Sequence, residues 1–257
     1  FGLAALCRPT VWAFAILASG VSFVVALAQG GKSRRAFVSA ARGWLAVGFA
    51  GAVTIAPWVV RNGNVFQELV VTTTHGGYTL YLGNNDEAYR AEVANPTETP
   101  WDSRAWQQTL PQPFLGEGAD HELLRDRWMS QHARDWIRQH PREFVESCWL
   151  RVKRFWNIVP GGADAGALPK IMQWGVALFF AIDLLAAVLG LWRLRRVEWA
   201  AWWPLVLLVL SFALVHVVYW SNLRMRAPVE PVLALLAARG LVSNRLDVSR
   251  AKVKQLI

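Results

Sequence analysis

The stretch WAAWWPLVLLVLSFALVHVVYWSNL, residues 199–223, decides the class of fold, because none of its 25 residues is Lys, Arg, Asp or Glu. At a rise of about 1.5 Å per residue, about 20 apolar residues cross the roughly 30 Å hydrocarbon core of a bilayer. The sequence therefore predicts that this stretch contains a transmembrane helix.

Other long apolar runs lie on either side of it. Uncharged runs of 20 and 18 residues cover residues 9–28 and 43–60. A further run, residues 171–192, is interrupted only by Asp183, and a last one, residues 225–242, contains three charged residues. Together with residues 199–223 they predict an all-α polytopic membrane protein with about five transmembrane helices.

The composition of the whole chain agrees with this class. Of its 257 residues, 54% are apolar and 18% are charged, the mean hydropathy is +0.25, and there are 15 tryptophans. An average soluble domain has roughly 25% charged residues. These values exclude a disordered chain, a fibrous repeat and most ordinary cytosolic enzymes.

Charge divides the chain into an acidic middle and basic flanks. Residues 63–168 hold 10 Lys/Arg and 14 Asp/Glu, a net charge of −4, while the remainder holds 17 and 4, a net charge of +13. Most of these flanking basic residues fall in three regions, which follow the first, third and fifth runs: Lys32, Arg34, Arg35, Arg42, Arg193, Arg195, Arg196, Arg239, Arg245, Arg250, Lys252 and Lys254. With five spans these regions share one face, which the positive-inside rule predicts to be cytoplasmic. The basic pI is therefore explained by membrane topology, and no nucleic-acid partner is predicted.

This topology predicts four parts. Residues 1–62 form two transmembrane helices with a basic cytoplasmic loop, and residues 63–168 form a small, mixed but mainly helical extracytoplasmic domain. Residues 169–242 form three transmembrane helices, and residues 243–257 form a basic cytoplasmic tail.

Within the acidic segment the residue patterns predict different local structures. Residues 65–82 mix Val, Thr, Tyr and Gly as short extended or irregular structure does, and residues 83–86 suit a turn. Four prolines predict a loop over residues 94–118. Apolar residues at spacings of three or four predict a helix over 120–139 and an amphipathic, Trp-rich helix over 141–157 that suits the lipid interface.

Three arginines near predicted membrane boundaries are candidates for contact with a lipid phosphate: Arg8, Arg224 and Arg226. A guanidinium group fits phosphate oxygens in a bidentate fashion, and an anionic lipid head group is the natural partner at that depth. The alternative is that these arginines only anchor helix ends, with their charged groups reaching toward water.

Residues 72–85, TTTHGGYTLYLGNN, form a second polar cluster. Glycine permits close backbone approach, while tyrosine rings and asparagine amides suit the apolar faces and hydroxyl groups of a sugar. The candidate sugar- or acceptor-binding residues are His75, Tyr78, Tyr81, Asn84 and Asn85. The alternative is a structural loop rich in turn-forming residues.

The chain has no metal-ligand spacing, nucleophile elbow, Walker loop or dinucleotide fingerprint. No cofactor or metal site is predicted, and the sequence leaves dependence on a divalent metal open.

Short motifs follow one another in an order that resembles a known family. They are GLAALCRPT (residues 2–10), APWVVRN (56–62), GGY (76–78) with LYLGNN (80–85), HPREF (140–144), RFW (154–156) and RMRAPVEP (224–231). The chain resembles the C-terminal half to two-thirds of bacterial GT-C type membrane glycosyltransferases. These are related to the dolichyl-phosphate-mannose-protein mannosyltransferases (protein O-mannosyltransferases) and to the aminoarabinose lipid A transferase.

The resemblance implies an activity and a location. Such enzymes move a sugar from a polyprenyl-phosphate donor to a lipid, glycan or protein acceptor at the outer face of the bacterial inner membrane. Arg8, Arg224 and Arg226 are then expected at the donor phosphate, and Arg61 joins the sugar- or acceptor-binding candidates. Met225 stands where the family usually has tyrosine.

The same resemblance implies that a part of the enzyme precedes Phe1. The catalytic acidic residue of the family lies in the first outer loop, between the first two spans, so this chain is expected to lack the N-terminal spans and to contain no catalytic residue of its own. Two alternatives are a non-catalytic relative or scaffold and a transporter of lipid-linked sugars. Only Asp183 is charged deep in a predicted span, which argues against a conduit.

Overall fold

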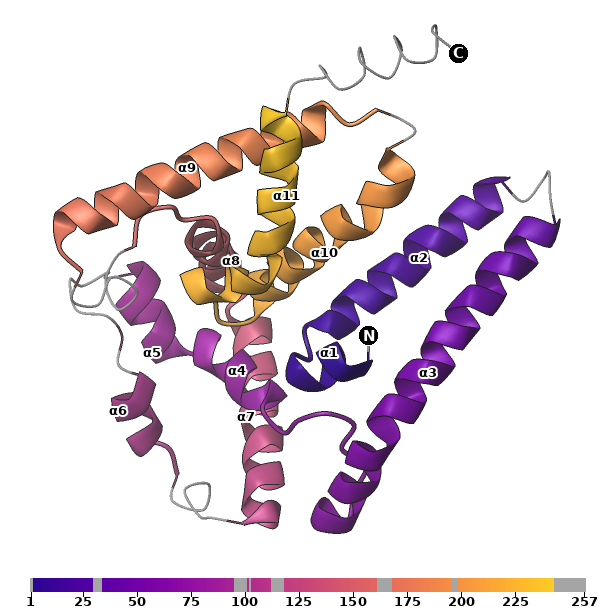
Figure 1. Ribbon diagram of the computed structural model, residues 1–257. Helices are drawn as coiled ribbons and strands as arrows, with labels where there is room; N and C mark the ends of the chain where they lie inside the picture. Colours follow the sequence, from indigo (N-terminus) through magenta and orange to yellow (C-terminus); the bar gives the residue numbers. More distant parts are fainter. Residues whose placement is uncertain are drawn as a thin grey trace, which may run out of the picture.

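The computed structural model describes residues 2–29, 34–94, 101, 103–111, 118–160, 168–195 and 198–242, and every regular element within these ranges is a helix (Figure 1). The prediction of an all-helical chain is confirmed for these residues. The elements fall into an N-terminal hairpin, a middle group of short and amphipathic helices, and a C-terminal group.

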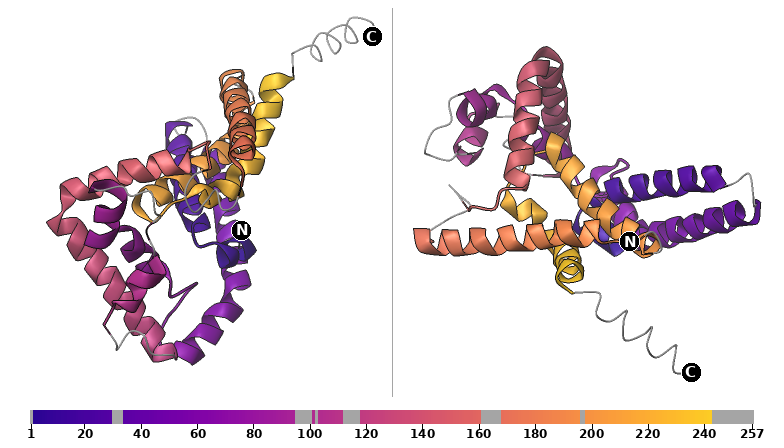
Figure 2. Two further views of the ribbon diagram at one scale, coloured as in Figure 1. Left: turned by 90° about the vertical axis from the view of Figure 1, so that its left-hand side faces the viewer. Right: turned by 90° about the horizontal axis from the view of Figure 1, so that it is seen from above.

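The N-terminal hairpin consists of α1 (Gly2–Cys7), α2 (Val11–Gln29) and α3 (Arg34–Phe66). Two views show α2 and α3 as neighbouring long helices (Figure 2). Short α1 packs on α3 so closely that a Cβ atom on Gly2 would lie 2.6 Å from the Cβ atom of Thr54.

The middle group is built around two amphipathic helices, α7 (Ala119–Gln139) and α8 (Pro141–Phe155). Both confirm predicted helices, and Pro141 is the first residue of α8, where its missing N–H group costs no hydrogen bond. The shorter elements of this group are α4 (Gly76–Gly83), α5 (Asp86–Tyr89), the π-helix η1 (Arg90–Ala94) and α6 (Ser103–Gln108).

The C-terminal group comprises α9 (Lys170–Trp192), α10 (Trp199–Val218), the 3₁₀ helix η4 (Leu223–Val229) and α11 (Glu230–Leu241). Helices α9 and α11 approach closely where glycines face the opposite backbone. A Cβ atom on Gly190 would lie 1.9 Å from the carbonyl oxygen of Leu236, and one on Gly240 would lie 2.1 Å from that of Ala186. Small residues at such contacts are typical of helices that pack inside membranes.

Three helices in the described part of the chain are long and apolar enough to cross a membrane: Ala41–Phe66 within α3, Lys170–Trp192 and Trp199–Val218. On α9, Trp174 and Trp192 are 65% and 80% exposed. They are 18 residues apart, which is about 27 Å along a helix and close to the thickness of a bilayer core. Exposed tryptophans at that spacing suit the two membrane interfaces, and the architecture is that of a helical membrane protein.

The predicted fifth span is not one continuous helix. Residues 223–229 form η4, and α11 has 12 residues, which is about 18 Å and too short to cross a bilayer alone. The paired prolines Pro228 and Pro231 account for the break, because proline disfavours helix in the residue before it. Helix α2 is apolar over Val11–Val25. The count of five spans stays a prediction.

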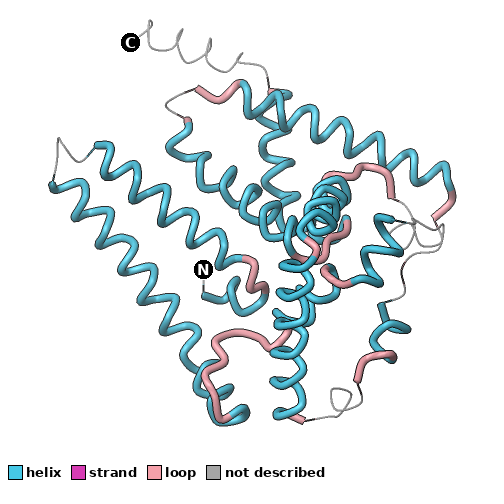
Figure 3. The backbone as a smooth tube through the Cα atoms, turned by 180° about the vertical axis from the view of Figure 1, so that it is seen from behind, coloured by secondary structure: helices cyan, strands magenta, loops and turns pink. Residues whose placement is uncertain are grey.

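The C-terminal ends of α2, α9 and α11 lie toward one end of the molecule, and α6 and α7 lie toward the other (Figures 1 and 3). The predicted topology expects these three helix ends on one face of a membrane, and it stays a prediction. Which end is cytoplasmic stays a prediction.

Two local predictions are wrong. Residues 76–83 form α4 instead of extended structure, because Leu80, Leu82 and Gly77 are buried where α4 packs on α7 and on its aromatic neighbours. The predicted loop over 94–118 contains α6, whose Trp106 is buried in the same cluster. Residues 95–100, 102 and 112–117 of that loop lie outside the described residues.

Candidate functional site

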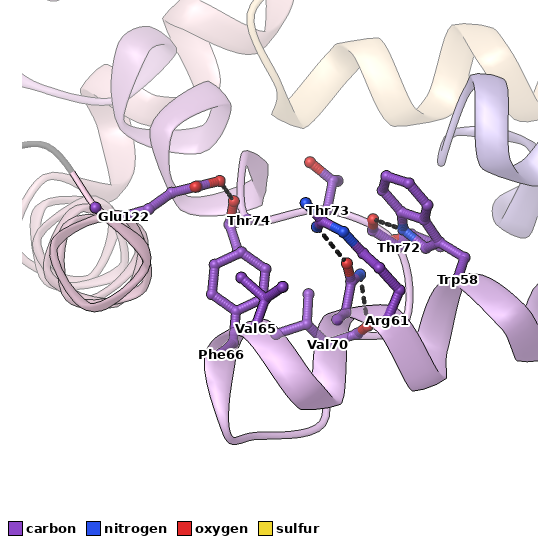
Figure 4. Close-up of a pocket in the computed structure, with 11 residues that line it drawn as sticks. Trp58, Arg61, Val65, Phe66, Val70, Thr72, Thr73, Thr74 and Glu122 are labelled. Carbon is purple, nitrogen blue, oxygen red and sulfur yellow. Dashed lines mark hydrogen bonds between the residues drawn. The ribbon is translucent and has the colours of Figure 1, made fainter.

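A groove of about 450 Å³ lies between the C-terminal part of α3, the segment that leads to α4, and the start of α7 (Figure 4). We call it the Trp58 groove. Its lining residues are Trp58, Arg61, Asn62, Val65, Phe66, Val70, Thr72, Thr73, Thr74, Gly118 and Glu122. It therefore combines an aromatic ring, a cation, hydroxyl groups and a carboxylate at one end of a membrane-spanning helix.

One side of the groove is formed by a cation on an aromatic ring. The guanidinium carbon of Arg61 lies 5.2 Å from the ring centroid of Trp58. The indole N–H of Trp58 donates to the carbonyl oxygen of Thr72 (2.7 Å), which holds the ring in place. Arg61 also donates to Oδ1 of Asn62 (3.0 Å), and the buried Asn62 amide donates to the carbonyl oxygen of Val70 (3.0 Å). The chain after α3 is thus tied back onto it, with Arg61 still exposed.

The opposite side is formed by hydroxyl groups and a carboxylate. The hydroxyl of Thr74 donates to Glu122 at the start of α7, and the hydroxyl of Thr73 accepts from the backbone N–H of His75 (3.2 Å). Figure 4 shows Glu122 and Thr74 at the left of the groove and Trp58 and Arg61 at the right, with Phe66 below Thr74. The Glu122 carboxylate lies where hydroxyl groups of a bound molecule can donate to it.

A contact between α4 and α7 positions the Thr74 side of the groove. The backbone N–H of Gly77 donates to Oδ1 of Asp126 (2.6 Å), and a Cβ atom on Gly77 would lie 1.9 Å from the carbonyl oxygen of Asp126. Desolvation raises the pKa of Asp126, and hydrogen bonds from the backbone of Gly77 and Tyr78 oppose that shift. Only glycine fits so close an approach, so this residue is needed by the packing.

Of the predicted sugar-binding residues, Arg61 lines the groove, and His75 lies directly after its Thr74 wall. His75 is exposed, with its ring centroid 5.7 Å from that of Tyr78. The Tyr78 hydroxyl accepts from the amide of Gln107 (3.0 Å). Residues 61 and 75 therefore lie in or next to the groove, whereas Tyr78 packs against the aromatic cluster of Leu82, Trp106 and Met129.

Tyr81 belongs to an aromatic cluster instead. Its ring centroid lies 5.2 Å from that of Trp106 and 5.7 Å from that of Trp128. Burial, with a smaller effect of the Asp86 charge, raises the pKa of Tyr81. The ring is thus part of the packing that attaches α6 to α4 and α7.

Asn84 and Asn85 have structural surroundings and are not available to a sugar. The fully buried amide of Asn84 donates to the carbonyl oxygens of Leu80 (2.7 Å) and Val218 (3.0 Å), and its oxygen accepts from Arg151 (3.0 Å). Asn85 caps the N-terminus of α5 by accepting from the backbone N–H of Ala88 (2.8 Å). We correct both assignments, because these polar atoms already have protein partners.

The three predicted phosphate contacts are also unlike one another. Arg226 is 2% exposed, is paired with Glu230, and donates to the carbonyl oxygens of Phe155 (3.2 Å) and Asn157 (3.0 Å). It borders a small, mainly apolar pocket of about 140 Å³, and its guanidinium carbon lies 4.8 Å from the centroid of the Phe180 ring. We therefore reassign Arg226 to packing.

Arg8 and Arg224 are exposed. Arg8 follows α1 and lies close enough to His216, near the end of α10, for their charges to interact. Arg224 is in η4, directly after the same end of α10. Both cations therefore remain accessible near one end of the apolar helices.

The sequence did not single out Glu122 or Arg151. Glu122 is one of several acidic residues on a predicted amphipathic helix, and its place opposite Arg61 depends on how α7 packs against α4. As a charged residue, Arg151 is expected on the polar side of the predicted amphipathic helix over 141–157, yet it is buried. Trp58 is part of a noted motif, but no local signal assigns it to a groove.

Comparison with known proteins adds no family to this geometry: no family model, curated protein or solved structure matches the chain. Within the described ranges, no three His, Cys, Asp or Glu side chains lie together as a metal site would need. The candidate site is therefore the Trp58 groove, at the end of a helix long and apolar enough to cross a membrane.

Proposed function

We propose that this chain is part of an integral membrane glycosyltransferase of the bacterial inner membrane that takes a sugar from a polyprenyl-phosphate donor. The observation that supports the proposal is the Trp58 groove. It places a cation, an aromatic face and hydroxyl-binding groups at the end of an apolar helix. A lipid-linked sugar has the matching parts: an apolar tail, a phosphate and a ring with many hydroxyls.

Arg61 is the groove's own cation for the phosphate. Its guanidinium group is exposed, and among the described residues it contacts an amide oxygen and the Trp58 ring, not a carboxylate. Charge-assisted hydrogen bonds from arginine to phosphate are among the stronger polar contacts that a protein can make. Arg8 and Arg224 are further accessible cations for the phosphate, and Arg226 is not included.

The sugar ring would lie between Trp58 and the Thr74–Glu122 side. An indole face packs on the apolar C–H face of a sugar, while hydroxyls of Thr72 and Thr73 and the carboxylate of Glu122 exchange hydrogen bonds with its hydroxyl groups. His75, directly after Thr74, is a candidate for contact with the acceptor, and Tyr78 lies against its ring.

The apolar tail would lie along α3. Val60, Val53 and Phe49 are exposed large apolar residues on this helix. Val60 directly precedes Arg61, and the other two lie about two and three turns before it. An isoprenoid chain in the lipid phase can cover them at no desolvation cost to polar groups. The proposal thus gives the tail, the phosphate and the sugar separate sites, in the order in which these three parts are linked.

Binding to the whole chain in lipid nanodiscs tests this proposal. We expect undecaprenyl phosphate to bind and undecaprenol, which lacks the phosphate, to bind at least about tenfold more weakly, as loss of a charge-assisted contact of about 1.4 kcal/mol implies. Arg61→Ala should remove most of that difference. Arg138→Ala is the matched control, because Arg138 is an exposed arginine paired with Asp135 on the outer face of α7.

Equal binding of the phosphate and the alcohol, or equal effects of the two arginine substitutions, would contradict the proposed donor site. Sugar transfer is measured separately, as release of polyprenyl phosphate from a radiolabelled lipid-linked sugar by membranes that contain the whole encoded protein. Phosphate-dependent binding without transfer would identify a non-catalytic lipid-binding relative.

A further inference from the structure

Helix α8 has two dissimilar faces. Ser147, Arg151 and Phe155, spaced four residues apart, are all buried. On the other side Val145 and Trp149, also four residues apart, are 65% and 61% exposed. These two residues are one turn apart, so they form an apolar strip that remains exposed in the described part of the chain.

The buried face of α8 is fastened to the end of an apolar helix. Arg151 donates to the carbonyl oxygens of Val217 (3.1 Å) and Val218 (2.9 Å), the last two residues of α10. It also donates to the carbonyl oxygen of Gly83 and to Oδ1 of Asn84 (3.0 Å). Because α10 is long enough to span a bilayer, its end marks a membrane boundary. The middle of α8 is therefore held at that boundary.

The orientation of α8 fits this position. Figure 1 shows α8 nearly end-on, whereas α3 and α9, two helices long and apolar enough to cross a membrane, run across the page, so α8 lies crosswise to both of them. The view from above shows α8 lengthwise (Figure 2). A helix of this kind lies in the plane of a membrane surface instead of crossing it.

Cations border both ends of the exposed strip. Lys153, one turn after Trp149, has its ammonium nitrogen 5.3 Å from the centroid of the Trp149 ring. Arg142 lies one turn before Val145 and is exposed, with a hydrogen bond to Glu146 (3.2 Å). Long basic side chains beside an apolar strip can place their charges among lipid phosphates while the strip enters the acyl region.

We propose that α8 is an interfacial helix. Val145 and Trp149 insert into the boundary between head groups and acyl chains of the adjacent leaflet, and Lys153 and Arg142 contact anionic lipid head groups. The helix thereby attaches the middle group of helices to the membrane at a second place, besides the chain connections to α3 and α9. This contact with bulk lipid does not depend on sugar transfer.

A single environment-sensitive label tests the proposal in the whole chain. In a Cys7→Ala, Cys148→Ala background, Val145→Cys is labelled with a fluorescent nitrobenzoxadiazole group and placed in nanodiscs that contain spin-labelled anionic phospholipid. Leu124→Cys is the matched control, because Leu124 is a 55% exposed apolar residue on α7, for which no lipid contact is proposed. We expect lipid quenching at position 145 to exceed that at position 124 at least about twofold, as insertion at the interface implies.

Equal lipid quenching at the two positions would overturn the proposal. So would a label at 145 that is shielded from both lipid quencher and aqueous iodide, because that result would mean that a protein partner covers the strip. Lys153→Gln should reduce quenching at 145 in anionic nanodiscs, and it should have no effect in zwitterionic ones. The folded state of each labelled protein is checked by its unfolding midpoint.

Discussion

The Trp58 groove and the junction of α8 with α10 each contain an arginine near the end of an apolar helix, and the two regions use it in opposite ways. At the junction Arg151 is buried and surrounded by four oxygen atoms of two other segments, residues 83–84 and 217–218. In the groove Arg61 is exposed, with an aromatic ring and one amide oxygen beside it. An arginine at a helix end is thus structural or available to a ligand according to how many protein acceptors reach it.

The largest effect is expected from Arg151→Ala. This change would leave the carbonyl oxygens of Gly83, Val217 and Val218 and the Asn84 amide oxygen without their donor in a buried region. Burial lowers the pKa of Arg151, and the nearby charges of Cys148 and Glu92 act in the opposite direction. We expect a loss of about 3–4 kcal/mol in the free energy of unfolding, measured by denaturation in detergent micelles.

Arg61→Ala is the contrasting change, with an expected loss of about 1 kcal/mol, because it removes the donor to one acceptor, Oδ1 of Asn62, instead of four. Comparable losses for the two variants would mean that the two arginines do not differ in the way described.

A second pair of arginines sharpens the comparison within one element. Arg226→Ala should cost about 2–3 kcal/mol, because it removes a buried partner of Glu230 and the donor to two backbone carbonyl groups. Arg224→Ala, two residues away and exposed, should cost less than about 0.5 kcal/mol. Unfolding midpoints of the two variants measure the difference. The reverse order would show that the structural arginine of η4 is Arg224.

The α4–α7 contact behind the groove is tested by two adjacent glycines. A Cβ atom on Gly77 would clash with the backbone of Asp126, whereas one on Gly76 would meet nothing within 4 Å. Gly77→Ala should therefore cost about 2 kcal/mol and weaken binding in the groove, since the Thr74 side must move. Gly76→Ala should change stability by less than about 1 kcal/mol, in the direction of stabilisation, because alanine favours a helix. Both are measured by unfolding in micelles.

The sequence predicts the large elements well and the small ones poorly, for a physical reason. Runs such as residues 171–192 and 199–223 are apolar along almost their whole length, so their hydrophobicity alone predicts a helix. The 3.6-residue periodicity of apolar residues predicts α7 and α8. Helix α4 is different. Its two initial glycines and its threonine favour other structures, and it is helical because packing against α7 stabilises it.

The same difference applies to the candidate site. Residue type suggested that Asn84 and Arg226 bind a ligand, and the family resemblance added Arg61. Asn84 and Arg226 instead meet acceptors or donors from residues 67 to 134 positions away along the chain. Glu122 enters the groove through a contact with Thr74, 48 positions away. Such long-range pairs have no local pattern, so the sequence could not separate binding groups from packing groups.

The smallest expected effect concerns the charge of Asp126, which supports the groove from behind. Burial raises its pKa in the folded protein above the ordinary aspartate value. An acid with a raised pKa binds its proton more tightly in the folded than in the unfolded state, so the folded protein loses stability as pH rises from the ordinary aspartate range through the raised pKa.

Asp126→Asn keeps a side-chain oxygen as acceptor for the Gly77 N–H and removes the charge. We expect its stability relative to the natural protein to increase as pH rises from about 3.5 to 6, by less than about 1 kcal/mol because Asp126 is only half-buried. Unfolding midpoints of both proteins across this pH range provide the measurement. A constant difference would mean that Asp126 titrates in the same way in both states, and that only its hydrogen bond to Gly77 positions the wall opposite Arg61.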